Sequence, residues 1–82
     1  MALARDFIHF LVDYAGAPQK ARVTVAALLS KERLQVGDVS HDQLIRIFIK
    51  YRVQIETIAL HKMQRGDTSN DGVTVTTEDL TP

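Results

Sequence analysis

The sequence contains no cysteine, so neither a disulfide nor a cysteine-ligated metal can hold its fold together. It also has no excess of charge, because ten basic residues balance ten acidic ones. A neutral chain creates no overall field that would attract nucleic acid or an anionic membrane. The apolar runs are far shorter than the roughly 20 residues that a bilayer span requires. We therefore expect no contact with a membrane.

The first residues lack the basic flank and the cleavage pattern of a signal peptide, and Asp6 follows at once. Together with the absence of cysteine, this predicts a cytoplasmic protein. The 45% of hydrophobic and 24% of charged residues are ordinary for a globular protein. The 82 residues fit a single domain, 1–82, whose core must form by side-chain packing alone.

Motifs of catalysis and cofactor binding are missing from the sequence. It has no nucleophile elbow, no phosphate-binding glycine-rich loop and no paired acids. The histidines His9, His41 and His61 do not have the i, i+4 spacing of a helical metal pair. The sequence therefore predicts a protein that is not an enzyme and that has no cofactor and no metal site.

The N-terminal part favours a β-hairpin over residues 6–29. Ile8, Phe10 and Val12 alternate with other residues as in a strand, although Phe7, Phe10 and Leu11 also fall at helical spacing. Strand and helix therefore both remain open for residues 6–14. The β-branched and aromatic content favours the strand, and the turn at residues 16–19 leads to a second strand-like run.

The clearest predicted element is a long helix over residues 40–64. Ser40 and Gln43 form a capping box at its start, and Gly66 follows its end. Because no Pro or Gly interrupts it, we expect one unbroken helix of about 24 residues and about 36 Å. Before it, Ser30 is predicted to cap a short helical turn over residues 30–34.

After the helix, residues 67–72 form a polar loop, residues 73–76 a short strand of alternating Val and Thr, and residues 77–82 a tail. These elements predict an α+β fold. Its arrangement would be a two-layer ββ-α-β, in which a short antiparallel sheet packs against the one long helix.

The long helix has more apolar surface than one small sheet can cover. One apolar face serves the core, through Leu44, Ile47, Phe48, Tyr51, Ile55, Ile58 and Ala59. A second apolar strip lies beside it, formed by Ile45, Ile49, Val53, Leu60 and Met63, with Arg52 and Glu56 set into it. Either another part of the chain, such as the N-terminal segment or residues 30–38, or a second copy must cover this strip. The second copy is favoured, which predicts a homodimer.

The opposite, polar face of the helix carries Arg46 and Lys50 among glutamines and His61. Such a stripe is typical of a solvated surface, but its hydrogen-bonding groups could also lie along phosphates. A nucleic-acid-binding regulator that uses Arg46 and Lys50 is therefore the alternative prediction.

The helix also resembles the signature of a family of small bacterial proteins, domain-of-unknown-function family 1488. The matching residues are Phe48, Arg52, Ile55, Glu56 and Ala59 in the helix, and Val73, Val75, Asp79 and Leu80 in the ending. Val23, Val25 and the turn over residues 30–34 resemble the family's second strand and short helix. The turn at residues 16–19 and the run Ala26 to Leu29 depart from its usual spacing. The resemblance implies a ββ-α-β arrangement and no established activity.

These observations together predict a small bacterial accessory or interaction protein. It would be a homodimer, and another protein could be its partner.

Overall fold

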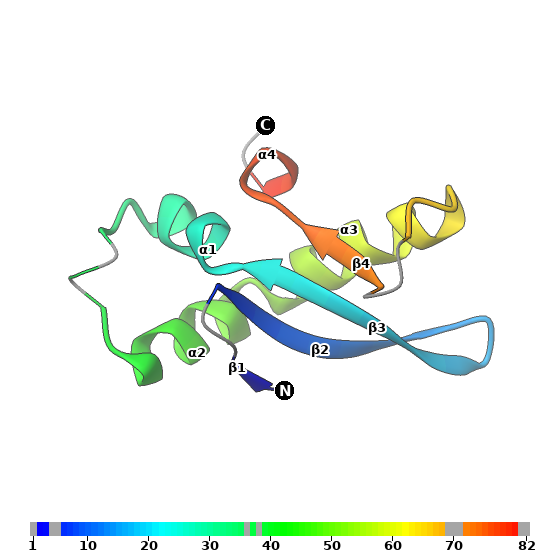
Figure 1. Ribbon diagram of the computed structural model, residues 1–82, viewed down its shortest axis with the longest axis horizontal. Coiled ribbons are helices and arrows are strands. Elements are labelled where there is room, and N and C mark those ends of the chain that lie inside the picture. The colour runs from blue at the N-terminus through cyan, green and yellow to red at the C-terminus, as the bar shows by residue number, and fades with distance from the viewer. Residues whose placement is uncertain (1, 4–5, 36, 38, 69–71, 81–82) are drawn as a thin grey trace.

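The computed structural model describes residues 2–3, 6–35, 37, 39–68 and 72–80, and it confirms an α+β fold (Figure 1). The elements follow in the order β1 Ala2–Leu3, β2 Phe7–Tyr14, β3 Ala17–Thr24, α1 Val25–Glu32, α2 His41–Lys50, α3 Arg52–Gln64, β4 Val73–Val75 and α4 Thr77–Leu80. The order therefore contains the predicted ββ-α-β core but adds β1, α1 and α4 and divides the long helix.

The four strands form one mixed sheet in the order β1-β2-β3-β4. The pairs β1–β2 and β2–β3 are antiparallel, whereas β3 and β4 are parallel. The prediction of an antiparallel sheet is therefore wrong for its last pair. Parallel neighbours need a long crossover, and the chain makes it through α1, α2 and α3 before it returns as β4.

Residues 7–14 form a strand, as favoured, and the predicted hairpin exists but is shorter than residues 6–29. Its tight turn places Ala15 at φ 55° and Gly16 at φ 81°, the pair of positive angles that matches the twist of a two-residue hairpin. The second strand ends at Thr24, whose Oγ1 accepts a hydrogen bond from the Ala27 N–H at 3.0 Å. This N-cap starts α1.

The short helical turn predicted over residues 30–34 is also wrong. Ser30 lies inside α1, which ends at Arg33 in the left-handed conformation with φ 56°. The residues between Ala26 and Leu29 are good helix formers, and Ala27 and Leu28 are fully buried in the core. Their burial on the helix side of the sheet explains why the chain leaves the hairpin early.

The prediction of one unbroken helix over residues 40–64 is wrong, although both of its ends are confirmed. Ser40 and Gln43 make the capping box, and Gly66, at φ 75°, follows α3. The helix is interrupted at Tyr51, where φ is −105° and ψ is 13°. It is therefore two helices, α2 and α3.

The interruption has a packing reason. On an ideal helix of about 100° per residue, the buried residues of α2 and those of α3 would point about 70° apart. The buried residues are Ile47 and Phe48 in α2, and Ile55, Ala59 and Met63 in α3. A straight helix would spread these buried residues over a wide arc of its circumference. The break lets α2 pack on α1 while α3 lies against β2 and β4 (Figure 1).

The strand predicted over residues 73–76 is confirmed as β4, but the predicted tail begins with a short helix. Thr77–Leu80 form α4, and Leu80 is fully buried. Residues 81–82 of the predicted tail lie outside the described residues. The helix has only four residues and one buried leucine, which is too short a pattern to recognise in the sequence. Composition alone therefore indicated a tail.

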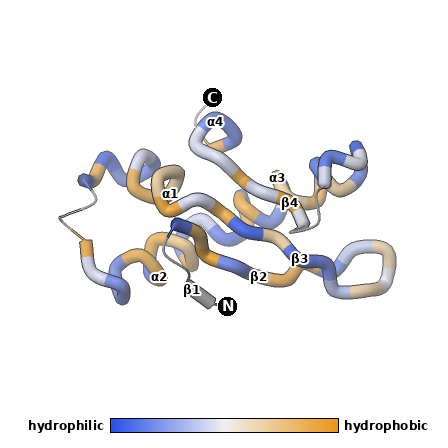
Figure 2. The backbone as a smooth tube through the Cα atoms, viewed as in Figure 1, coloured by the Kyte–Doolittle hydropathy of each residue, from blue (hydrophilic) through white to orange (hydrophobic). Residues whose placement is uncertain are grey.

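The core lies on one side of the sheet. β2 contributes Ile8, Phe10 and Val12, and the Phe10 and Phe48 rings are 5.2 Å apart. Each of α1, α2, α3 and α4 adds at least one residue to the same core. Figure 2 shows β2 as a mostly hydrophobic strand with a few hydrophilic positions.

Candidate functional site

The second apolar strip of the predicted helix is divided by the fold. Val53 is 81% exposed and Ile49 is 56% exposed, whereas Ile45 and Leu60 are half-buried against the core. Met63 belongs to the core itself, because α3 turns this residue toward β2 and β4. What remains at the surface is the exposed strip, which we define as Ile49 and Val53.

The exposed strip has an electrically neutral border. Arg52 Nε and Glu56 Oε1 are 2.9 Å apart along α3, so the two charges set into the predicted strip pair with each other. Ile49 and Val53 lie on either side of Tyr51, four residues apart. They therefore form an apolar patch across the junction of the two helices.

The basic stripe is exposed as predicted, but its two cations are not equivalent. Lys50 Nζ lies 2.7 Å from Glu32 Oε1 at the end of α1. Hydrogen bonds from Lys50 and from the Tyr51 hydroxyl lower the pKa of the Glu32 carboxyl, and the same carboxylate raises the pKa of Lys50. Arg46 is exposed, and no described residue makes a polar contact with it. Among the described residues of this stripe, Arg46 is therefore the cation that has no counter-charge.

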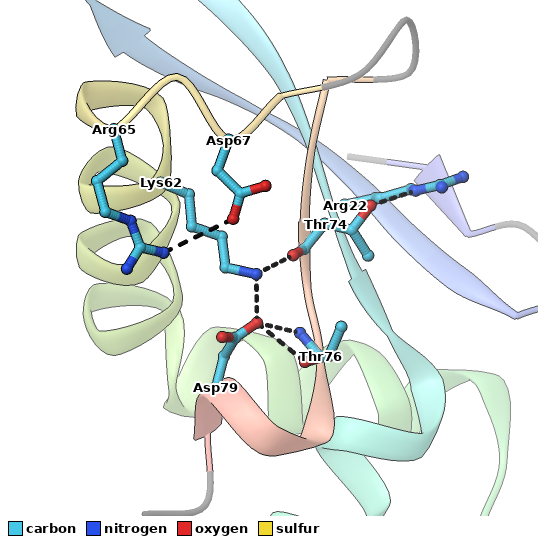
Figure 3. A network of polar contacts seen from close by, with 7 residues as sticks. All are labelled: Arg22, Lys62, Arg65, Asp67, Thr74, Thr76 and Asp79. Carbon is cyan, nitrogen blue, oxygen red and sulfur yellow. Dashed lines mark hydrogen bonds and ion pairs between the residues drawn. The ribbon is translucent and has the colours of Figure 1, made fainter.

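A network of polar contacts that sequence reasoning missed lies at the β4 edge of the sheet (Figure 3). Lys62 Nζ of α3 lies 2.6 Å from Asp79 Oδ2 of α4 and donates to the Thr74 carbonyl of β4 at 2.8 Å. Asp79 Oδ2 also accepts from the N–H and the hydroxyl of Thr76, at 2.8 and 3.0 Å. The network therefore joins α3, β4 and α4.

The Asp79 carboxyl stays ionised in this partly buried place. Burial opposes its ionisation, but the hydrogen bonds from Lys62 and Thr76 outweigh this and hold its pKa below the ordinary value. On the neighbouring strand, Arg22 Nε donates to Thr74 Oγ1 at 2.9 Å. Lys62 donates a hydrogen bond to the Thr74 carbonyl of the edge strand β4. This bond protects the edge from pairing with another chain.

One signal in the sequence could have revealed this network. Lys62 lies four residues after Ile58 and seven after Ile55, so it shares their core-facing side of the helix. A lysine in such a position needs a partner, because an unpaired charge is costly to bury. The sequence did not identify that partner, since Asp79 lies in the segment that composition indicated to be a tail.

An open depression of about 250 Å³ adjoins the network and is lined by Lys62, Asp67, Thr68, Gly72, Thr74 and Thr76. The Lys62 ammonium group already binds Asp79 and the Thr74 carbonyl. It therefore holds α3, β4 and α4 together and does not present a free cation to a ligand. In the described part of the chain, no three His, Asp or Glu side chains converge as a metal site would require. His41 and His61 are exposed on α2 and α3, and His9 is half-buried on β2.

Comparisons of the chain with protein-family models, with curated proteins and with solved structures gave no match. The resemblance to domain-of-unknown-function family 1488 stays a prediction. Among the described residues, no helix has the length and hydropathy that crossing a bilayer demands.

Proposed function

We propose that this chain is a small bacterial accessory protein that acts by binding other proteins, without catalysis, and that it is a homodimer paired through the exposed strip. The proposal rests on the exposure of Val53 and Ile49, two β-branched apolar side chains at the middle of α2–α3. The proposal keeps the cytoplasmic location that the cysteine-free composition predicts.

The surroundings of the strip suit a contact between identical helices. An apolar centre with a polar border is the usual anatomy of an interface, and the centre contributes most of the binding energy. Here the border contains the Arg52–Glu56 pair, so two copies related by a twofold axis would not bring an uncompensated charge against its like. The pair could also exchange partners between the copies.

No described segment competes with a second copy for this surface. The predicted intramolecular covers were the N-terminal segment and residues 30–38. The described part of the former lies in the sheet, and the described part of the latter leaves Val53 81% exposed. A stable interface buries about 800 Å² on each partner, so the contact would have to extend along both helices from the strip.

Sedimentation velocity of the parent protein tests the proposal. We expect a monomer–dimer equilibrium, and we expect Val53→Asp and Ile49→Asp to give folded monomers because the charge would be buried at the contact. Gln54→Asp is the matched control, since it adds the same charge on the polar face of the same helix. A parent protein that stays monomeric at high micromolar concentration would rule out the dimer.

The alternative of a nucleic-acid-binding regulator through Arg46 and Lys50 is weaker. The Glu32 carboxylate, 2.7 Å from Lys50 Nζ, would have to be displaced or repelled by an approaching phosphate. Arg46 serves as a control position when binding of oligonucleotides is measured.

A further inference from the structure

One face of the sheet carries no described helix, because all four helices contribute to the core on the other side (Figure 1). Alternation along β2 and β3 places on this face Phe7, His9, Leu11, Lys20 and Arg22, which we call the open face. Leu11 is 62% exposed, Lys20 is exposed, and the other three are half-buried. Leu11 and Lys20 are therefore the solvent-facing part of the open face.

The register of the two strands interleaves rings with cations. His9 is paired with Arg22, and Leu11 with Lys20. The Arg22 guanidinium lies 4.1 Å from the centroid of the Phe7 ring, and the Phe7 and His9 rings are 6.2 Å apart. Arg22 is further fixed by its hydrogen bond to Thr74 on β4. The rings and the guanidinium thus form a preorganised group across three strands.

From these contacts we propose that the open face binds single-stranded nucleic acid. Bases stack on aromatic rings and on arginine planes, and lysine and arginine contact the phosphates between them. From Phe7 to Leu11 the strand advances about 13 Å, and a sheet surface of this kind stacks two or three unpaired bases. This proposal is independent of the dimer, since the exposed strip lies in the helical layer.

The charges of the open face favour this occupant over others. Lys20 and Arg22 lie in its middle, while Asp13, near the hairpin turn, limits the basic area to that middle. Lys20 is exposed on this face, so a second copy packed face to face would bring like charges together, which opposes pairing. A duplex hides the faces of its bases from the rings, so it offers only its phosphates.

Fluorescence anisotropy with labelled oligouridylate and oligothymidylate of about 12 nucleotides, a length within known site sizes, tests the proposal and separates RNA from DNA. At about 50 mM salt we expect the parent protein to bind at least one of them with Kd below about 100 μM. A phosphate contact of Lys20 predicts that log Kobs falls against log salt with a slope of about −0.7.

The variants locate the site. Lys20→Glu should weaken binding about tenfold or more and reduce the salt slope by about 0.7, the contribution of one phosphate contact. Phe7→Leu keeps an apolar side chain but removes the ring, and should weaken binding about tenfold by the loss of one stacked base. Arg46→Glu is the matched control on the helical layer, with the same change of charge, and should leave Kd nearly unchanged.

Far-UV circular dichroism establishes that each variant is folded, and Lys20→Glu, at an exposed position, decides the question if Phe7→Leu does not fold. The proposal is overturned if the parent protein binds neither oligonucleotide under these conditions. It is also overturned if Arg46→Glu weakens binding and Lys20→Glu does not. Equal affinity for a duplex of the same length would overturn the stacking of unpaired bases.

Discussion

Two lysine–carboxylate pairs of almost the same length hold two corners of the molecule. Lys62 and Asp79 are 2.6 Å apart where α3 meets β4 and α4, and Lys50 and Glu32 are 2.7 Å apart where α1 meets α2. The Lys62 side chain is only 12% exposed, whereas that of Lys50 is 61% exposed. The two ion pairs therefore have nearly equal lengths, but their lysines differ strongly in exposure to solvent.

The sheltered pair, Lys62 and Asp79, is part of a network of hydrogen bonds, whereas the solvated pair, Lys50 and Glu32, has its further contacts with Tyr51. Lys62 also binds the Thr74 carbonyl, and Asp79 also accepts two hydrogen bonds from Thr76. Water screens the charges of an exposed pair and can replace either partner. The contribution of an ion pair to stability therefore follows from its burial and its further bonds, and not from its length.

The largest expected effect concerns the backbone that positions the network. Gly72, just before β4, has φ 89°, and a Cβ there would lie 2.1 Å from the Lys20 carbonyl oxygen of β3. Gly72→Ala would push β4 away from β3, and we expect it to lower the free energy of unfolding by more than about 3 kcal/mol. Urea unfolding followed by circular dichroism measures this.

Gly37→Ala is its control, because nothing lies within 4 Å of a Cβ at Gly37. It should leave stability nearly unchanged. Equal losses for the two variants would show that the β4 edge has no special rigidity.

The next effect compares the lysines themselves. Lys62→Met removes the partner of a partly buried carboxylate and of the Thr74 carbonyl, and should lower the free energy of unfolding by about 2 kcal/mol. Lys50→Met makes the same change in the solvated pair and should cause no loss beyond the error of the same urea measurement. A loss for Lys50→Met as large as that for Lys62→Met would contradict the role assigned to burial.

The smallest effect is the acid sensitivity of the sheltered pair. The pKa of Asp79 is lower in the folded chain, so this carboxylate stabilises the fold above the ordinary carboxyl pKa of about 3.9. That stability is lost as the pH falls through the folded pKa, because the unfolded chain then binds the proton first. Asp79→Asn should therefore lose less stability than the parent protein between about pH 5 and pH 3.

Urea midpoints measured across this pH range test the expectation. Glu32→Gln is the control, because the Glu32 pKa is also lowered but its partner Lys50 is exposed. A pH dependence of Asp79→Asn equal to that of the parent protein would mean that Asp79 is not bound in the folded chain as the network requires.

The elements with strong local signals were predictable from the sequence. The capping box of Ser40 and Gln43 and the glycine after α3 form through contacts among near neighbours, and the Val–Thr alternation of β4 indicates a strand from its own residues. The candidate site was predictable only in part. Ile49 and Val53 are exposed, but Met63, three residues after Leu60 on the same predicted strip, is in the core.

What the sequence alone determined, then, are the class of fold, the starts and ends of the α2–α3 region, and the excess of apolar surface on it. The tertiary structure alone decided the break at Tyr51, the parallel pairing of β3 with β4 and the partners of Lys62. Local elements depend on the conformational preferences and hydrogen bonds of residues a few positions apart. The break, the pairing and the ion pair depend on which distant surfaces meet, and a 17-residue separation such as that between Lys62 and Asp79 leaves no periodic pattern in the sequence.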